Sequence, residues 1–214
     1  MVGFFVVLEG PEGAGKTTLA QDLGRRLSAA GLDPLMVREP GGTPAAEALR
    51  HELLHDGRVW TPEAELLYMC AARADLVAKL IRPALDQGRV VVSDRFDLST
   101  RAYQGAGRGL PMVHVDWVNR AATGGLTPDL TVVLDVPPEV GEARQLLQGK
   151  VRDRLDRESL DFHRRVRAAY HEASGPGLIH LDATVPPPIL SGRVWDILGG
   201  VRADLFGAGR EQVL

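Results

Sequence analysis

The sequence predicts an α/β fold with a doubly wound, five-stranded parallel sheet flanked by helices. Five short apolar runs alternate with segments of helical spacing. Most of these runs are continuously apolar, as expected for strands that are covered on both faces. Strands that alternate with helices favour right-handed crossovers and parallel pairing. The predicted strands are residues 4–9, 34–39, 90–94, 130–136 and 178–183.

The helical segments carry start and stop signals as well as apolar spacing. Leu19, Leu23 and Leu27 lie four residues apart, so they share one helix face. The second predicted helix starts behind Thr61 as its N-cap and ends before Pro83. The predicted helices are residues 17–31, 62–82, 166–174 and 191–206, with another after the Pro-Gly-Gly turn in 37–50.

Length and composition indicate one globular domain rather than a binder of nucleic acid or membranes. The 214 residues fit a single domain over 1–207, and the tail 208–214 is expected to be flexible. A net charge of −3 provides no basic field for nucleic acid. Cys70 is the only cysteine, and no apolar run is long enough to span a membrane. We therefore expect a cytoplasmic protein.

Residues 10–17 match the phosphate-binding pattern G-x-x-x-x-G-K-[ST], between a predicted strand and a predicted helix. Glycines let backbone N–H groups converge on phosphate oxygens, and the helix N-terminus favours the same anion. Lys16 would contact the β- and γ-phosphates, and the Thr17 hydroxyl would bind Mg²⁺. The pattern predicts a P-loop NTPase-type fold that binds ATP and Mg²⁺. The predicted nucleotide-binding residues are Gly10, Glu12, Gly13, Ala14, Gly15, Lys16, Thr17 and Thr18.

Glu12 is an unexpected residue in a loop that holds phosphate. A carboxylate pointed at the triphosphate would repel it by several kcal/mol at short range in a low-dielectric site. Glu12 is therefore expected to point away from the nucleotide, either to solvent or toward a second ligand that carries a hydroxyl group.

A P-loop occurs in GTPases, motors, ATPases and small kinases, and other segments favour a kinase. The chain has no N-K-x-D guanine reader. Asp94 and Arg95 follow a buried strand, where open α/β sheets bind ligands. Arg95 suits phosphate, and Asp94 can assist Mg²⁺, directly or through water, or accept from the acceptor group. Residues 146–159 are rich in cations and suit a short lid, although a solvated charge run would look the same.

Taken together, these segments resemble thymidylate kinase, in its bacterial form. The resemblance spans nearly the whole chain and comprises EGPEGAGKTT, REPGGT, AAR at 71–73, DRFDLSTRAYQG, GRG at 107–109, PDLTVVLDV and RLDRES. The P-loop alone is generic. The segments REPGGT and DRFDLSTRAYQG are far more specific, so the match depends on several independent motifs.

The resemblance implies a role for each matching residue. Glu12 would contact the 3′-hydroxyl of dTMP, and Tyr103 would lie beside C2′ and disfavour a ribose. Arg95 would bridge the acceptor phosphate and the incoming phosphoryl group, assisted by a lid arginine, Arg152 or Arg154. Met69 stands where relatives often have a phenylalanine that stacks on thymine, and Tyr68 and Phe96 are possible substitutes for that ring. Residues 38–75 are expected to form an acceptor-binding region. The remaining residues of the implied dTMP site are Glu39, Arg50, Arg73, Thr100 and Gln104.

The expected reaction is ATP-dependent phosphorylation of dTMP to dTDP, with Lys16, Asp94, Arg95, Arg152 and Arg154 as catalytic residues. The resemblance also implies a homodimer. Other readings stay open: a P-loop kinase with a different nucleoside-monophosphate or small-metabolite acceptor, an ATP-binding regulatory switch without an acceptor, and a nucleic-acid-stimulated ATPase, which the net charge disfavours.

Overall fold

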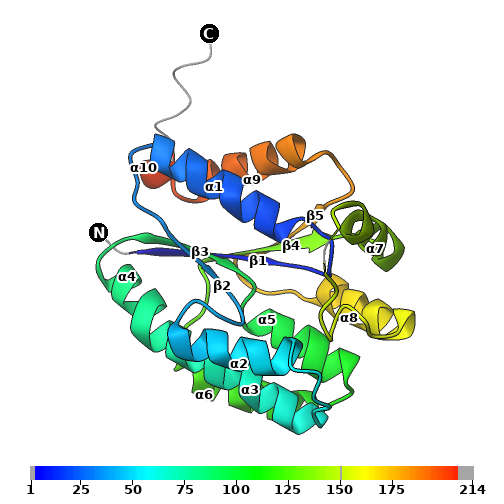
Figure 1. The fold of residues 1–214 in the computed structure, drawn as a ribbon. Helices are drawn as coiled ribbons and strands as arrows, with labels where there is room; N and C mark the ends of the chain where they lie inside the picture. The colour runs from blue at the N-terminus through cyan, green and yellow to red at the C-terminus, as the bar shows by residue number, and fades with distance from the viewer. Residues whose placement is uncertain (1–2, 150, 207–214) are drawn as a thin grey trace.

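The computed structural model describes residues 3–149 and 151–206 and contains one five-stranded parallel sheet (Figure 1). The strand order is β2-β3-β1-β4-β5, and all four pairings are parallel. The predicted fold class is confirmed, and each predicted strand agrees with the structure to within one residue at either end. The strands are β1 (Phe4–Glu9), β2 (Leu35–Arg38), β3 (Val90–Asp94), β4 (Leu130–Asp135) and β5 (Leu178–Asp182).

One face of the sheet is covered by α1 (Lys16–Ala29), α9 (Pro187–Val201) and α10 (Ala203–Phe206) (Figure 1). Alternate residues of β1 point to this face because side chains alternate along a strand. They pack against the leucines of α1, which are almost fully buried as their spacing predicts. This packing anchors α1 behind the phosphate loop and so fixes the direction of its N-terminus.

The opposite face packs against α3 (Pro62–Leu76), the π-helix η1 (Val77–Ile81) and α4 (Arg82–Asp86). Thr61 caps α3, as predicted, by accepting from the backbone N–H of Ala64. The predicted end before Pro83 is wrong, because the helical path continues through this residue into α4. Proline lacks an N–H and crowds the preceding turn of an α-helix. The wider π-helical turn lies directly before the proline and lets the chain continue.

The remaining helices are α2 (Pro44–Leu54), α5 (Asp97–Thr100), the π-helix η2 (Arg101–Gly107), α6 (Met112–Thr123), α7 (Pro138–Leu147) and α8 (Leu160–Glu172). The helix α8 starts at Leu160 rather than at residue 166, because Ser159 caps it by accepting from the N–H of Phe162. Ser159 is the last residue of the predicted lid at 146–159, and the sequence did not predict it as a cap. The predicted lid joins α7 to α8; Lys150 within it, and the predicted tail 208–214, lie outside the described residues.

No helix within residues 3–149 and 151–206 combines the length and the apolar character needed to cross a membrane.

Candidate active site

The phosphate loop joins the central strand β1 to α1. Its backbone is left-handed at several glycines, of which Gly10 (φ 134°) and Gly13 (φ 71°) are the most constrained. A Cβ on Gly10 would lie 2.3 Å from the carbonyl oxygen of Leu134, and one on Gly13 would lie 2.2 Å from that of Gly141. Only glycine fits both the dihedral angles and the space. No side chain caps the first turn of α1, so its N–H groups are available for an anion, as at other helix N-termini.

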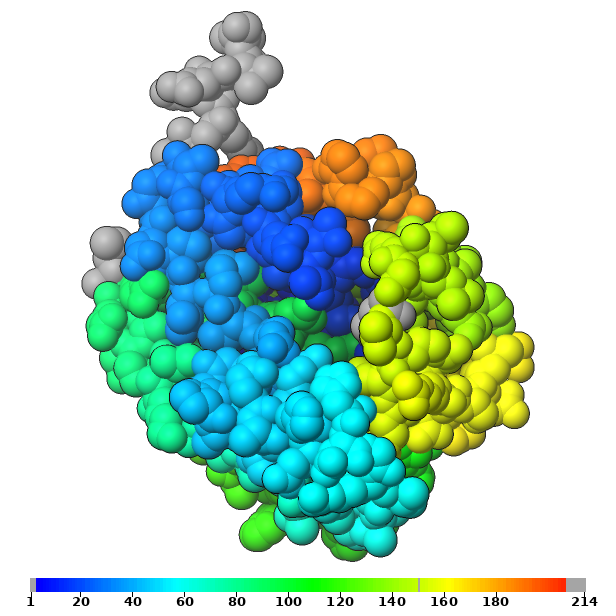
Figure 2. Space-filling view, viewed as in Figure 1, coloured from blue at the N-terminus to red at the C-terminus, as the bar shows by residue number. Residues whose placement is uncertain are grey.

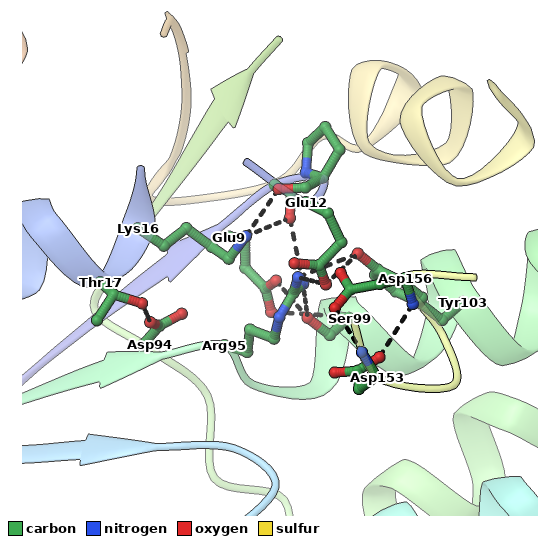
Figure 3. Close-up of polar contacts among 12 residues, drawn as sticks. Glu9, Glu12, Lys16, Thr17, Asp94, Arg95, Ser99, Tyr103, Asp153 and Asp156 are labelled. Carbon is green, nitrogen blue, oxygen red and sulfur yellow. Dashed lines mark hydrogen bonds and ion pairs between the residues drawn. The ribbon is translucent and has the colours of Figure 1, made fainter. Parts of the chain in front are cut away.

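Lys16 lies under this loop and is 6% exposed. Its Nζ donates to the carbonyl oxygens of Gly10 and Pro11, over 2.9 and 2.8 Å (Figure 3). Burial, together with the charge of Arg95, lowers the pKa of Lys16 to about 8. Because this ammonium group is almost fully removed from solvent, a negative charge beside it would stabilise its charged form. The position of Lys16 therefore suits phosphate.

Thr17 and Asp94 meet between α1 and the end of β3. The Thr17 hydroxyl donates to Asp94 Oδ2 over 2.6 Å (Figure 3). A hydroxyl and a carboxylate are hard oxygen donors, which Mg²⁺ prefers, and Mg²⁺ commonly takes only one or two protein ligands beside phosphate and water. The pair therefore fits Mg²⁺. No group of three or more His, Cys, Asp or Glu side chains suited to a metal occurs in the described part of the chain.

Arg95 connects the loop to α5 and η2. It is the one non-glycine residue with a left-handed backbone among those described (φ 79°), a conformation that costs on the order of 1–3 kcal/mol. Its Nη1 donates to Gly10 O, Ser99 Oγ and Tyr170 Oη, each over 3.1 Å. The guanidinium of Arg95 thereby contacts the phosphate loop, α5 and α8 at once.

Glu12 points toward Arg95. Its Oε1 accepts from Arg95 Nη2 over 2.5 Å and from the Tyr103 hydroxyl over 3.1 Å (Figure 3). The sequence left solvent and a second ligand open as the target of Glu12; in the structure its side chain instead contacts two residues of the site, Arg95 and Tyr103. The carboxylate thereby balances a guanidinium that is only 13% exposed.

The loop, β3 and the helices beyond it surround one cavity of about 260 Å³. Figure 2 shows this hollow between α1, the α2 region and the lid. Most of the predicted site residues line it, whereas Gly10, Ala14, Arg152 and Arg154 do not. The predicted residues that line it are Glu12, Gly13, Gly15, Lys16, Thr17, Thr18, Glu39, Arg50, Met69, Arg73, Asp94, Arg95, Thr100, Tyr103 and Gln104.

Arg73 and Glu39 form a buried ion pair in the part of the cavity away from the loop. Arg73 Nε donates to Glu39 Oε2 over 2.7 Å, and both side chains are 3% exposed. Arg73 Nη1 also donates to the Thr100 hydroxyl over 2.8 Å. Glu39 Oε1 is buried without a hydrogen-bond partner among the described residues. Burial, against the attraction of Arg73, raises the pKa of Glu39 to about 7.

Arg50 and Met69 complete the lining from α2 and α3. Arg50 Nη1 donates to the carbonyl oxygen of Pro40 over 2.9 Å, which holds the guanidinium at the cavity. Met69 is 9% exposed and presents an apolar thioether to the cavity. Neither of the proposed substitute rings lines the cavity: Tyr68 packs against Trp60, and the fully buried Phe96 packs against Phe5.

The lid arginines make contacts outside the cavity. Arg152 donates to the carbonyl oxygen of Asp156 and pairs with Glu142 on α7. It lines a neighbouring cavity that also borders Pro11 and Glu12 of the phosphate loop. Arg154 is held by Glu65 and by the carbonyl oxygen of Leu53. Arg154 does not line this neighbouring cavity.

Sequence reasoning missed three residues that support the site: Glu9, Ser99 and Tyr170. Glu9 is fully buried at the end of β1 and accepts from the backbone N–H groups of Phe96 and Ser99, from Ser99 Oγ and from Tyr170 Oη. Ser99 and Tyr170 in turn accept from Arg95. A carboxylate at the end of an otherwise apolar strand was the one available signal, because its burial requires several donors.

Comparison with known proteins agrees with this geometry. The profile of the family described as "Thymidylate kinase" matches residues 8–190. The chain is similar to the thymidylate kinase of Thermomicrobium roseum, with 50% identity over 91% of this chain and 93% of the relative. It is 47% identical to that of a Synechococcus strain, over 97% and 99%, and 44% identical to that of Deinococcus radiodurans, over 90% and 95%. The chain therefore belongs to the thymidylate kinase family, as its motifs predict.

Proposed function

We propose that this protein transfers the γ-phosphoryl group of ATP to dTMP and releases ADP and dTDP. The observation that carries the proposal is the shared cavity, in which a complete phosphate loop faces a second set of cations, Arg50, Arg73 and Arg95. A switch that binds ATP alone has no need of this second set. Membership of the thymidylate kinase family supports ATP as the phosphoryl donor.

The loop binds the phosphates of ATP through its N–H groups and the N-terminus of α1, from Gly10 to Thr18. Lys16 turns from the loop carbonyl oxygens to the β- and γ-phosphate oxygens. The Thr17 hydroxyl and the Asp94 carboxylate, which lie within hydrogen-bond distance of each other, would hold Mg²⁺, Asp94 directly or through water. When bound, Mg²⁺ neutralises charge on the phosphate oxygens.

The acceptor dTMP lies with its phosphate at Arg50 and Arg95 and its base at Arg73, Thr100 and Gln104. Glu12 accepts from the 3′-hydroxyl, Tyr103 excludes a 2′-hydroxyl, and Met69 packs against the base. Glu39 holds Arg73 in place. These assignments follow the family resemblance, and the positions of the side chains around one cavity support them.

Catalysis depends on position and charge rather than on a strong base. A phosphate oxygen of dTMP is already an anionic nucleophile, so the site has to align it and neutralise the transferring group. Arg95 lies between the loop and the acceptor half and can contact both phosphates. A lid arginine, Arg152 or Arg154, adds a further positive charge at the transferring group when the lid moves. Arg152 is favoured because it lines a cavity that also borders the loop.

The protein acts in the cytoplasm as a homodimer. The apolar residues Leu67 on α3 and Val113 and Trp117 on α6 are 58%, 71% and 73% exposed, and α3 packs against α6. An apolar surface across neighbouring helices suits a second copy. Light scattering should give twice the mass of one chain for the wild type and a lower mass for Trp117→Glu; a single-chain mass for the wild type would exclude the dimer.

A coupled ADP-release assay with dTMP, dUMP, UMP, CMP and AMP tests the activity. The highest kcat/KM is expected for dTMP, and Lys16→Ala should abolish transfer. Preference for another monophosphate would identify a different kinase. ATP binding without ADP release stimulated by dTMP would indicate a switch, and hydrolysis stimulated by nucleic acid would indicate an ATPase of another class.

A further inference from the structure

Glu65 in the first turn of α3 is a buried carboxylate that does not line the cavity. Its side chain is 1% exposed, yet it receives donors from two other parts of the chain. On the η2 side, Gln104 Nε2 donates to Oε1 over 2.7 Å and Arg108 Nη2 donates to Oε2 over 2.9 Å. From the lid, Arg154 Nη2 donates to Oε2 over 2.7 Å. One carboxylate therefore joins α3, a cavity-lining amide and the lid.

The charge of Glu65 determines which way the Gln104 amide points. Burial acts to raise the pKa of Glu65, but hydrogen bonds from Arg108 and Gln104 and the charges of Arg108 and Arg154 outweigh it, so the pKa lies below its ordinary value. An ionised carboxylate can only accept hydrogen bonds. The atom of Gln104 that faces it must be the NH₂ group, and the carbonyl oxygen takes the other side of the amide.

The side of the Gln104 amide that carries the carbonyl oxygen faces the cavity. Gln104 is 1% exposed overall and lines the cavity together with Arg73. Among the described residues, none donates a hydrogen bond to the side-chain oxygen of Gln104, Oε1. The two side chains differ in what they offer a base, because a guanidinium has only donors whereas this amide presents an acceptor.

We propose that Glu65 is a positioning residue that sets base specificity: by holding the NH₂ group of Gln104, it leaves only an acceptor for the base, so the pocket selects bases with a ring N–H. The inference depends on the proposed function, because it assumes that the base of the acceptor lies at Gln104. Thymine and uracil carry N3–H beside the O4 acceptor, which matches Gln104 beside Arg73. Cytosine carries an N3 acceptor beside a 4-amino donor, so both contacts would be mismatched and buried polar groups left unpaired.

The test is Glu65→Gln, which keeps the shape of the side chain but can either accept or donate, so the Gln104 amide is free to turn over. The assay measures kcat/KM for dTMP, dUMP and dCMP. The ratio of dTMP to dCMP is expected to fall at least about tenfold. The ratio of kcat/KM for dTMP to that for dUMP should stay within about twofold of the wild-type ratio, because both bases carry N3–H. A general loss of stability would lower all three values together and would leave the ratios unchanged.

Two further experiments test whether the effect of Glu65→Gln arises from misfolding and whether it acts through Gln104. Glu65→Asp keeps the charge for Arg108 and Arg154 but draws the carboxylate away from Gln104, so the ratio of kcat/KM for dTMP to that for dCMP should again fall. If Glu65→Gln fails to fold, Glu65→Asp serves as the test in its place. In a Gln104→Met background, Glu65→Gln should change the ratio no further, because Glu65 acts through that amide.

Glu63→Gln is the matched control, since Glu63 lies in the same turn, is exposed and forms no ion pair with any described residue. It should behave as the wild type. A wild-type ratio in the folded Glu65 variants would overturn the inference. A wild-type protein that does not phosphorylate dTMP would instead overturn the proposed function, so the two failures are distinguishable.

Discussion

Glu12 and Arg95, 83 residues apart in the sequence, form an ion pair of 2.5 Å beneath the phosphate loop. The Tyr103 hydroxyl contacts both partners, over 3.1 Å to Glu12 and 3.0 Å to Arg95. A carboxylate in a loop that binds anions is therefore matched by a guanidinium from the next strand of the sheet. The pair lies where the loop meets the acceptor half of the cavity, so its two members can contact the sugar and the phosphate of one nucleotide.

Glu12→Gln tests the contact with the 3′-hydroxyl. In the wild type, kcat/KM for dTMP should exceed that for its 3′-deoxy analogue by about tenfold or more, because a carboxylate is a strong hydrogen-bond acceptor. In Glu12→Gln this difference should shrink, since a neutral amide accepts more weakly. Steady-state kinetics with both substrates measure the effect. An unchanged difference would mean that Glu12 serves Arg95 alone.

Arg95→Ala should reduce kcat by on the order of 10²-fold or more, because the transferring group loses a cation. Arg95→Lys is the matched variant: it keeps the charge but not the fork, in which Nη1 donates to Gly10, Ser99 and Tyr170 while Nη2 donates to Glu12, so recovery should be partial. Circular dichroism checks that the variants are folded. Full turnover in folded Arg95→Ala would remove this residue from the mechanism.

Thr17→Ala should raise the Mg²⁺ concentration needed for half-maximal activity by on the order of tenfold, because one of the two hard oxygen ligands is lost. Thr17→Ser retains the hydroxyl and should titrate like the wild type. Asp94→Asn should also weaken Mg²⁺ binding and so raise the Mg²⁺ concentration needed for half-maximal activity. EDTA should stop the reaction in every active variant. An unaltered Mg²⁺ titration in Thr17→Ala would place the metal elsewhere.

Glu39 should make the protein less stable as the pH rises. The native state keeps a proton on Glu39 up to a pKa of about 7, whereas the unfolded chain releases it near 4.5. Between these values the native state binds more protons, so the free energy of unfolding falls as pH increases. Buried Glu9 and Asp97 also have raised pKa values and contribute in the same direction.

The variant Glu39→Gln isolates the contribution of this one residue. Urea unfolding at several pH values should give a shallower fall between pH 4.5 and 7 than in the wild type. The amide can still accept from Arg73, so the variant should fold. Parallel curves for the two proteins would show that Glu39 does not titrate in this range.

Much of the fold and of the site followed from local sequence. The strands are short and continuously apolar, and each carries its own signal, so their limits were predicted to within one residue. The glycines and Lys16 of the phosphate loop could be identified because their spacing directly reflects how a backbone wraps an anion. The path of the chain through Pro83 could not, because a π-helical turn is chosen by packing against β1 and β3 rather than by local propensity.

The sequence by itself determined the parallel sheet, the phosphate loop and the family, since each is recognised from short runs of residues that are neighbours in the chain. Only the tertiary structure decided which way Glu12 points, that Glu9 anchors Arg95 through Ser99 and Tyr170, and that Glu65 holds Gln104. Those arrangements join residues far apart in sequence. They are fixed by the need to pair every buried charge, a condition that can be evaluated only when all the partners are in place.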